Sequence, residues 1–301
     1  MKSVQKVRPR QVGETAKPAR PSKAAPPAQR PADVASPLIV FGMGRSGTRM
    51  CANILNNSRE IELQGEIGGP VGAKMMSWLE SVRSGRETPD ADRMYRLARA
   101  AFRDSTPSRR QVRNRARWFG HKTPRHERHF DRYEAIFDDP ARPAHYVYCL
   151  RNPFHVWRSY RIMPWNKFKN VREFLDAWIK SVRTYERMIE AAPGRVHLFN
   201  LDDMIRAPDL SAWIAPNLLE PLGVSPASFR RPVDELENSN SASNKLGVKP
   251  SPPPASDMVE IATDREAARM VRTYFPWMEE ELAGYEAQAP LHKRLFRFRA
   301  A

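Results

Sequence analysis

Cysteine is almost absent from this sequence, and long apolar runs are missing altogether. Only two of its 301 residues are cysteines, Cys51 and Cys149, and their spacing suggests neither a disulfide framework nor a metal site. No apolar run reaches the length of a membrane span. The first 36 residues lack the apolar core of a secretory signal, and their low serine content disfavours a transit peptide. These absences predict a protein of the reducing cytoplasm.

Positive charge and proline are both in excess. The chain carries a net charge of +16 and 27 prolines, and residues 1–36 alone hold eight Lys or Arg against two acids. That segment is poor in apolar side chains, so burial cannot offset the entropy lost on ordering. We therefore expect a disordered leader over 1–36, one large α/β domain over 37–290 and a basic, aromatic tail over 291–301. The tail has the composition of a segment that rests on an anionic membrane surface.

A strand, a glycine-containing turn and a helix follow the leader. Residues 38–41 form a short apolar run typical of a buried parallel strand, and residues 50–55 have the apolar spacing of a helix. The turn between them contains Gly42, Gly44 and Gly47. Such an arrangement gathers backbone N–H groups and the positive end of a helix dipole into an anion-binding cradle. Its natural guest is a phosphate or sulfate ester, although the turn taken alone could also be a mere connection.

The turn departs from the phosphate-binding pattern G-x-x-x-x-G-K-[ST]. Gly42 and Gly47 occupy the outer glycine positions, but Thr48 stands where the lysine belongs, which argues against ordinary ATP or GTP hydrolysis. The run from Arg45 to Thr48 instead resembles the 5′-phosphosulfate loop of the sulfotransferases, in which a basic residue, Ser, Gly and Thr follow the first strand. This resemblance implies that the donor nucleotide is held by Gly44, Arg45, Ser46, Gly47, Thr48 and Arg49.

A second motif strengthens the resemblance. The β-branched and aromatic run 144–150 ends at Arg151, Pro153 suits the first turn of a helix, and Ser159 lies eight residues beyond the arginine. Sulfotransferases use an arginine and a serine in this arrangement to hold the 3′-phosphate of the donor. A guanidinium grips phosphate through two hydrogen bonds, and a hydroxyl adds one more donor. A purely structural helix cap is the alternative.

Two further strand ends supply the candidate catalytic residues. Ligands of a parallel sheet collect beyond the carboxyl ends of its strands, and Glu66 follows a short predicted strand at 61–63. Glu66 is the candidate general base, with a solvated turn residue as the alternative. Lys122 ends the predicted strand 118–122 and resembles the lysine of the family's lysine-threonine element, beside the bridging oxygen of the donor. Pro124 and Arg125 stand where some sulfotransferases carry a catalytic histidine, which favours Glu66.

Several other segments have weaker interpretations. The helical pattern 171–190, with apolar residues from Phe174 to Ile189, predicts a packing helix. We expect Trp165 and Phe168 to pack in the core rather than to line an acceptor pocket. We further expect a solvated arginine-rich face or an anion-attracting rim at 103–117, surface histidines at His126 and His129, and capping or structural roles for Asp202 and Asp203. The final helix is expected over 257–285, with an interruption near Pro276. The polar loop at 238–247 either closes over the 3′-phosphate with Ser241 and Lys245 or is simply disordered.

The resemblance extends over residues 37–285 and implies a three-layer α/β/α fold with a central parallel sheet, similar to that of the P-loop NTPases. It also implies 3′-phosphoadenylyl sulfate as donor, no metal, catalytic roles for Glu66, Lys122 and Arg45, and an acceptor hydroxyl on a carbohydrate or glycolipid. Two rivals remain open. A P-loop nucleotide or small-molecule kinase lacks its lysine here, and a nucleic-acid-binding protein would account for the charge of +16 although no nucleic-acid-binding module is visible.

Overall fold

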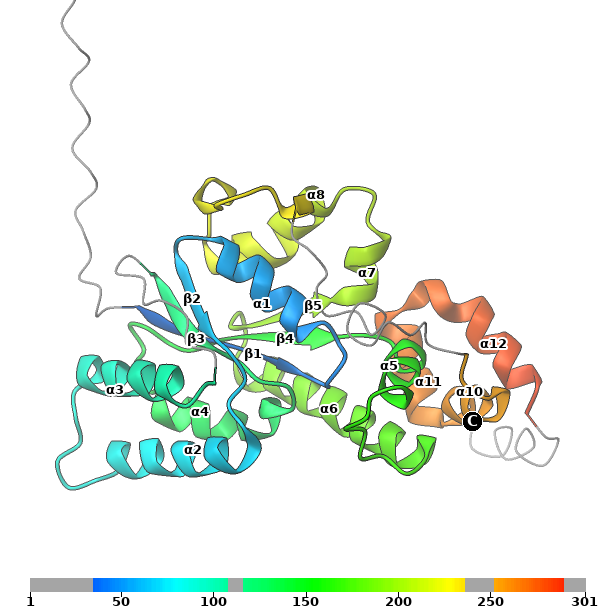
Figure 1. The fold of residues 1–301 in the computed structure, drawn as a ribbon, viewed down its shortest axis with the longest axis horizontal. Helices are drawn as coiled ribbons and strands as arrows, with labels where there is room; N and C mark the ends of the chain where they lie inside the picture. The colour runs from blue at the N-terminus through cyan, green and yellow to red at the C-terminus, as the bar shows by residue number, and fades with distance from the viewer. Residues whose placement is uncertain (1–34, 108–115, 236–251, 290–301) are drawn as a thin grey trace, which may run out of the picture. The chain divides into compact units, whose positions relative to one another are not determined.

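The computed structural model describes residues 35–107, 116–235 and 252–289 (Figure 1). The chain divides into two units, Met1–Arg30 and Pro31–Ala301, and every described residue belongs to the second. The predictions for the leader, for Ser241 and Lys245, for the tail 291–301 and for most of the arginine-rich segment therefore fall outside the described residues. Within the described ranges, no helix combines the length and the apolar character that crossing a membrane requires.

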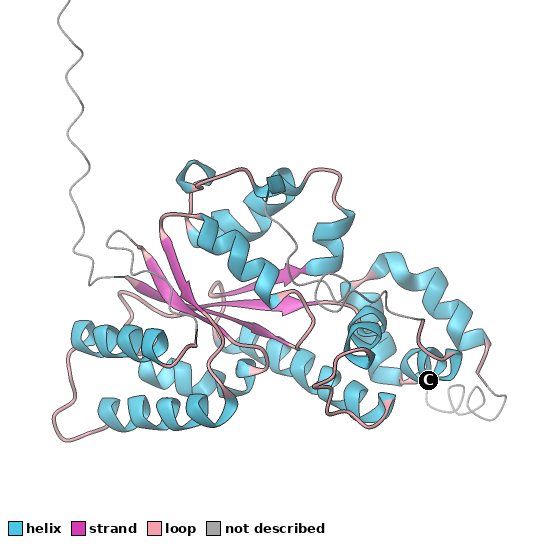
Figure 2. Cartoon of the chain, viewed as in Figure 1, coloured by secondary structure: helices cyan, strands magenta, loops and turns pink. Residues whose placement is uncertain are grey.

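A five-stranded sheet, drawn as magenta arrows in Figure 2, forms the middle layer of the fold. All its strand pairs are parallel, and the strand order is β2-β3-β1-β4-β5. The strands are β1 (Ser36–Gly42), β2 (Ile61–Gln64), β3 (Trp118–Lys122), β4 (His145–Leu150) and β5 (Val196–Asn200). Residues 37–42 of β1 are all buried, as expected for a central strand covered on both faces. The predicted strands are thus confirmed.

Helices cover both faces of this sheet. The helices are α1 (Thr48–Asn57), α2 (Gly69–Arg83), α3 (Ala91–Asp104), α4 (Phe130–Ile136), α5 (Pro153–Arg161), α6 (Val171–Ala191), α7 (Leu201–Arg206), α8 (Leu210–Ile214), α10 (Ala255–Thr263), α11 (Arg265–Tyr274) and α12 (Glu279–Ala287). The shorter turns are η2 (His126–His129), η3 (Ala215–Leu219), η4 (Glu220–Leu222), η5 (Pro226–Ser228), η6 (Val233–Glu235) and η7 (Pro276–Met278).

Alternate residues of β1 supply the two cores. Leu38 and Val40 pack with α1, α7 and the segment after it, whereas Ile39 and Phe41 pack on the opposite face with α2, α3, α4 and α6. This alternation follows from the two-residue period of a strand. Figure 1 shows α1, α7 and α8 on one side of the sheet and α2, α3, α4 and α6 on the other. The predicted three-layer α/β/α fold is confirmed.

Two predictions about the helices were wrong. The final helix expected over 257–285, with an interruption near Pro276, is three helices. Pro276 opens a separate turn before α12, as expected, but a further break was not predicted: Asp264 caps α11 by accepting hydrogen bonds from the Glu266 and Ala267 N–H groups. Ile189, expected to pack in the core, is 40% exposed on α6. The rest of that pattern holds, since Phe174 and Trp178 are completely buried.

The strand order decides where a site can form. β1 lies between β3 and β4, so Val40 of β1 is opposite both Lys122 of β3 and Val147 of β4. Because all strands are parallel, their carboxyl ends lie along one side of the sheet, the carboxyl edge. The segments that follow β1, β3 and β4 lie next to one another there. The glycine turn is therefore flanked by Lys122 at the end of β3 and by Arg151 just after the end of β4.

Candidate active site

The turn between β1 and α1 is shaped by two glycines. Gly47, the N-cap residue of α1, has φ of +87°, a backbone conformation that residues with a Cβ rarely adopt. A Cβ on Gly44 would lie 2.1 Å from the hydroxyl oxygen of Tyr160. Among the described residues, no side chain caps the first turn of α1. The backbone N–H groups at the start of α1 therefore have no side-chain cap as hydrogen-bond acceptor. Such N–H groups at a helix start are the arrangement that binds anions.

Two buried polar atoms at this turn are unsatisfied. Within the described ranges, neither Ser46 Oγ nor Arg151 Nε has a hydrogen-bond partner. Ser46 is fully buried, and Thr48 is 5% exposed. An unsatisfied buried donor or acceptor costs about 1–3 kcal/mol. The residues therefore fit a bound anion that would accept hydrogen bonds from them.

The two motifs found in the sequence meet here. Arg45 Nε donates a hydrogen bond of 2.8 Å to Ser159 Oγ, across 114 positions of the chain. Arg151 Nη1 lies 3.4 Å from the carbonyl oxygen of Arg45, to which it donates. Burial lowers the pKa of both arginines, and the charge of Arg151 adds to the effect on Arg45. Two partly desolvated guanidinium groups are thus held side by side, and an anion between them would offset that cost.

A buried carboxylate orients the second motif. Asp202, at the start of α7, accepts hydrogen bonds from the backbone N–H of Asn152 at 2.7 Å and from its side-chain amide at 2.9 Å, and Asp202 Oδ1 lies 2.8 Å from His155 Nδ1. Its Oδ1 also lies 3.7 Å from Arg151 Nε. The structural role predicted for Asp202 is confirmed, but the cap of α7 is Asn200, which accepts from the Asp202 and Asp203 N–H groups.

Lys122 and Glu66 form an ion pair on the other side of the turn. Lys122 Nζ donates a hydrogen bond to Glu66 Oε1. The lysine side chain is 5% exposed whereas that of Glu66 is 52% exposed. Burial lowers the pKa of Lys122, and the charge of Glu66 opposes that shift while Arg49, exposed on the first turn of α1, reinforces it. The pair places a buried cation at the sheet edge and a carboxylate facing solvent.

A buried polar network supports the loop that carries Glu66. Thr123 Oγ1 accepts a hydrogen bond of 3.0 Å from the backbone N–H of Ile67 and lies 2.9 Å from His121 Nδ1. The Tyr133 hydroxyl then joins His121 Nε2 at 2.8 Å and His126 Nδ1 at 2.9 Å. The prediction that His126 lies on the surface was wrong, since it is 2% exposed. The presence of a histidine in the sequence does not indicate whether its side chain is buried. The burial of His126 follows from its packing against Tyr133.

This network makes stability depend on pH. Burial lowers the pKa of His126 to about 3, whereas its pKa in the unfolded chain is about 6.5. Between these two pH values the unfolded chain binds a proton at His126 and the folded chain does not. Stability is therefore retained above about pH 6.5 and falls as the pH drops toward 3. Between pH 7.5 and pH 5.0, His126 should account for a loss of about 2 kcal/mol in the free energy of unfolding.

Urea unfolding at the two pH values measures this loss. We expect His126→Asn to lose about 2 kcal/mol less than the wild type between pH 7.5 and pH 5.0, whatever its stability at pH 7.5. Equal losses in the two proteins would show that His126 is not held neutral by its burial.

Two residues at this edge were not predicted from the sequence as part of the site, and a third was predicted to be buried but is exposed. Tyr160, on α5, covers Gly44, and Arg125, just after β3, donates its backbone N–H to the carbonyl of Gly42 at 2.8 Å. Arg125 has φ of 64°, and nothing in the sequence around an arginine indicates such a left-handed backbone conformation. Trp165, expected in the core, is 52% exposed.

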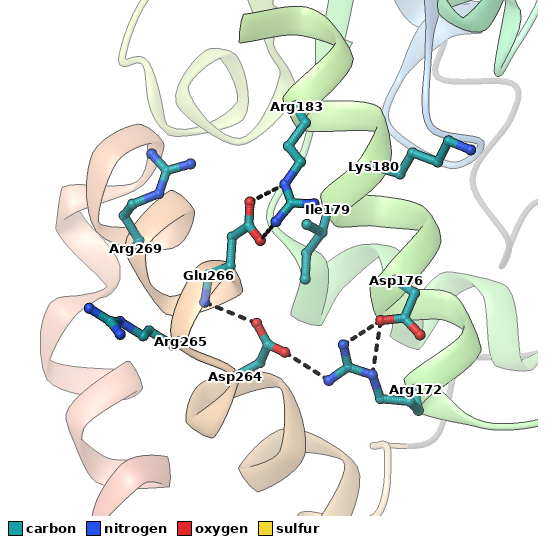
Figure 3. A pocket seen from close by; sticks show the side chains of 9 residues that line it. All are labelled: Arg172, Asp176, Ile179, Lys180, Arg183, Asp264, Arg265, Glu266 and Arg269. Atoms are coloured by element: carbon teal, nitrogen blue, oxygen red, sulfur yellow. Dashed lines mark hydrogen bonds and ion pairs between the residues drawn. The ribbon is translucent and has the colours of Figure 1, made fainter. Parts of the chain in front are cut away.

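A cavity of about 1030 Å³ lies away from these residues, between α6 and the α10–α11 region (Figure 3). Its lining residues form ion pairs with one another: Arg172 pairs with Asp176 and Asp264, and Arg183 pairs with Glu266. None of the predicted site residues lines it. The groove is therefore a charged helix–helix boundary. Among the described residues, no three His, Cys, Asp or Glu side chains are placed to hold a metal ion.

The model of the sulfotransferase family matches residues 37–223. This chain belongs to the sulfotransferase family. The matched range of the sulfotransferase contains the glycine turn, Glu66, Lys122, Arg151 and Ser159, and the match decides against the kinase and nucleic-acid-binding alternatives.

Two solved structures are similar to this sulfotransferase. The sulfotransferase domain of the olefin synthase of Synechococcus PCC 7002 is 16% identical, with 72% of this chain and 84% of that chain covered and a TM-score of 0.42. The sulfotransferase STF9 from Mycobacterium avium is 17% identical, with 64% of each chain covered and a TM-score of 0.36. No curated protein sequence matches significantly.

Proposed function

We propose that this sulfotransferase moves the sulfuryl group of 3′-phosphoadenylyl sulfate to a hydroxyl group of a carbohydrate or glycolipid. The observation that carries the proposal is the hydrogen bond of 2.8 Å between Arg45 Nε and Ser159 Oγ, which joins the two anion-binding motifs at one sheet edge. A donor with phosphate groups at both its 5′ and 3′ positions requires two such motifs side by side.

Each motif takes one end of the donor in this proposal. The 5′-phosphosulfate lies in the turn from Gly44 to Arg49, where Ser46 Oγ has no hydrogen-bond partner among the described residues. Arg151 and Ser159 hold the 3′-phosphate, and Asp202 keeps the Arg151 guanidinium in place. Ser241 and Lys245 complete the 3′-phosphate site in the prediction, although they lie outside the described residues.

The chemistry assigns different tasks to Lys122 and Glu66. The acceptor oxygen bonds to sulfur while the bond from sulfur to the bridging phosphate oxygen breaks, which leaves adenosine 3′,5′-bisphosphate. Lys122 and Arg45 stabilise the negative charge that develops on that bridging oxygen. The exposed carboxylate of Glu66 takes the hydroxyl proton of the acceptor. No metal takes part in this scheme, and alignment of the reactants supplies much of the rate, as in phosphoryl transfer.

The choice of acceptor rests on Glu66 as base. Pro124 and Arg125 occupy the place of the histidine of small-molecule sulfotransferases, so the resemblance is to the branch that sulfates carbohydrates. We place the reaction in the cytoplasm. The tail 291–301 would bring the enzyme to an anionic membrane surface when the acceptor is a glycolipid.

Protection by nucleotides tests the proposed donor. Adenosine 3′,5′-bisphosphate should raise the melting temperature clearly more than adenosine 5′-monophosphate does, because only the former reaches both motifs. Arg151→Gln should weaken bisphosphate binding about ten- to a hundredfold and leave binding of the monophosphate nearly unchanged, since one charge-assisted contact contributes about 1.5–3 kcal/mol.

Arg187→Gln is the matched control, because Arg187 lies on α6 with a side chain 55% exposed and pairs with Asp131. It should leave both affinities unchanged. Failure of the bisphosphate to protect the protein, or an Arg151→Gln variant that binds it normally, would contradict the proposed donor.

A further inference from the structure

Arg125 lies at the carboxyl edge of the sheet and has a strained, left-handed backbone conformation. Its φ of 64° is unusual for a residue with a Cβ, and Arg45 is the only other such case among the described residues. The backbone N–H of Arg125 donates to the carbonyl oxygen of Gly42, which ties it to the start of the glycine turn. Strained residues persist where the surrounding structure enforces them, and they cluster at functional sites.

The Arg125 side chain is exposed and free to bind an anion. Its guanidinium carbon lies 6.0 Å from the centre of the Phe168 ring. No ion pair within the described ranges includes Arg125, in contrast to Arg142 and Arg195, which pair with carboxylates. A guanidinium group so placed can form two hydrogen bonds with a carboxylate or sulfate.

An aromatic surface adjoins this arginine. Tyr160 is its centre: the rings of Trp165 and Phe168 lie edge-on to it, with centroid distances of 5.7 and 5.2 Å. Tyr160 is 5% exposed and its hydroxyl lies against Gly44, whereas Trp165 is 52% exposed. The surface therefore runs from the glycine turn to solvent. An exposed tryptophan beside a reaction site offers a flat face on which a sugar or aryl ring can pack.

The charges around Tyr160 tie this surface to the candidate catalytic residues. Burial raises the pKa of Tyr160 to about 12, and the charges of Arg125 and Arg45 oppose that rise while Glu127 and Glu66 add to it. The phenol therefore remains a hydrogen-bond donor at neutral pH. The Tyr160 hydroxyl lies against Gly44, just after β1, and the neighbouring strand β3 ends at Lys122, the partner of Glu66, so the aromatic surface and the candidate base lie at the same edge of the sheet.

We propose that Arg125, Tyr160, Trp165 and Phe168 form the acceptor subsite, and that it selects a sugar ring carrying an anionic substituent. The ring packs on Trp165 with its reactive hydroxyl toward Glu66, and Arg125 binds the anionic group. This proposal rests on the proposed transfer to a carbohydrate and adds the charge of the acceptor. It also accounts for a cation at the place where a small-molecule enzyme carries its histidine.

Two glycosides that differ in one group test the selectivity. Affinities for para-nitrophenyl β-glucuronide and para-nitrophenyl β-glucoside are measured by calorimetry with adenosine 3′,5′-bisphosphate present. The wild type should bind the glucuronide at least about tenfold more tightly, as one charge-assisted contact provides. Arg125→Gln should abolish that preference, whereas Arg128→Gln, which removes an equal charge from an exposed residue of η2, should retain it.

Further variants separate stacking from charge and guard against misfolding. Trp165→Ala should weaken both glycosides to a similar degree, and Trp78→Ala, at a tryptophan 47% exposed on α2, should change neither affinity. Arg125→Asn provides a second charge-free variant, because asparagine tolerates the left-handed backbone better than most residues.

Three outcomes would overturn this subsite: equal affinity of the wild type for the two glycosides, no binding of either, or loss of the preference in Arg128→Gln. Binding of the bisphosphate is measured separately in the same proteins. If the bisphosphate does not bind but the glucuronide preference depends on Arg125, the donor proposal fails and the subsite stands. If the bisphosphate binds without any glucuronide preference, the donor stands and the subsite fails.

Discussion

Replacing Glu66 by glutamine is expected to lower kcat about a hundred- to ten-thousand-fold, the usual contribution of a general base. Glutamine keeps the size of the side chain but cannot take the acceptor proton. Because Glu66 lies outside both proposed anion-binding motifs, the variant should bind adenosine 3′,5′-bisphosphate like the wild type. The rate is measured as transfer of labelled sulfate to fractionated glycans and glycolipids, and nucleotide binding is measured as the shift in melting temperature.

A matched control separates loss of the base from loss of an ion pair. Glu80, on α2, has a side chain 40% exposed and lies 3.7 Å from Arg132 Nε. Glu80→Gln therefore breaks a surface ion pair near the C-terminal end of α2, the helix whose opposite end follows Glu66, and should leave kcat unchanged. Unchanged turnover in Glu66→Gln would remove Glu66 from the mechanism. Loss of nucleotide binding in that variant would instead assign Glu66 to holding Lys122.

Replacing Lys122 by methionine should separate activity from stability. One preorganised donor at the developing charge contributes about 2.7–4 kcal/mol, so kcat should fall about a hundred- to a thousandfold. Lys122 is 4% exposed, and burial lowers its pKa, so the folded protein tolerates this charge at a cost. An apolar side chain of similar length removes that cost, and we expect the melting temperature to stay equal or rise.

The pH profile gives this second prediction an independent measurement. Lys122 is useful only while protonated, and because its pKa is lowered, kcat/KM should fall at a pH below the ordinary lysine range. Lys122→Arg should retain part of the activity and lose this decline, since arginine stays charged. A methionine variant with normal kcat, or an arginine variant with the same decline, would contradict a role for Lys122 in charge stabilisation.

Much of the fold could be predicted because its signals are local. The run 38–41, the glycine turn and Pro153 at the first turn of α5 depend on backbone preferences that each short segment carries with it. The same applies to α6, whose three- and four-residue spacing shows which side faces the core.

Burial was harder to predict because it depends on partners distant in the sequence. His126 is buried by Tyr133 and by the close approach of Gly72, where an added Cβ would lie 3.0 Å from the imidazole. Trp165 is 52% exposed, although the Tyr160 ring lies edge-on to it at a centroid distance of 5.7 Å. Neither outcome follows from residue type, since histidine and tryptophan both occur in cores and on surfaces.

The sequence by itself determined the fold class, the family and the residue types of both proposed anion-binding motifs, because glycine turns, helix starts and strand ends are encoded by residues close together in the chain. Only the tertiary structure decided that Arg45 reaches Ser159, that Glu66 pairs with Lys122 and that Arg125 stands beside an exposed aromatic surface. The physical reason is the strand order: placing β1 between β3 and β4 gathers at one edge side chains that are remote along the chain.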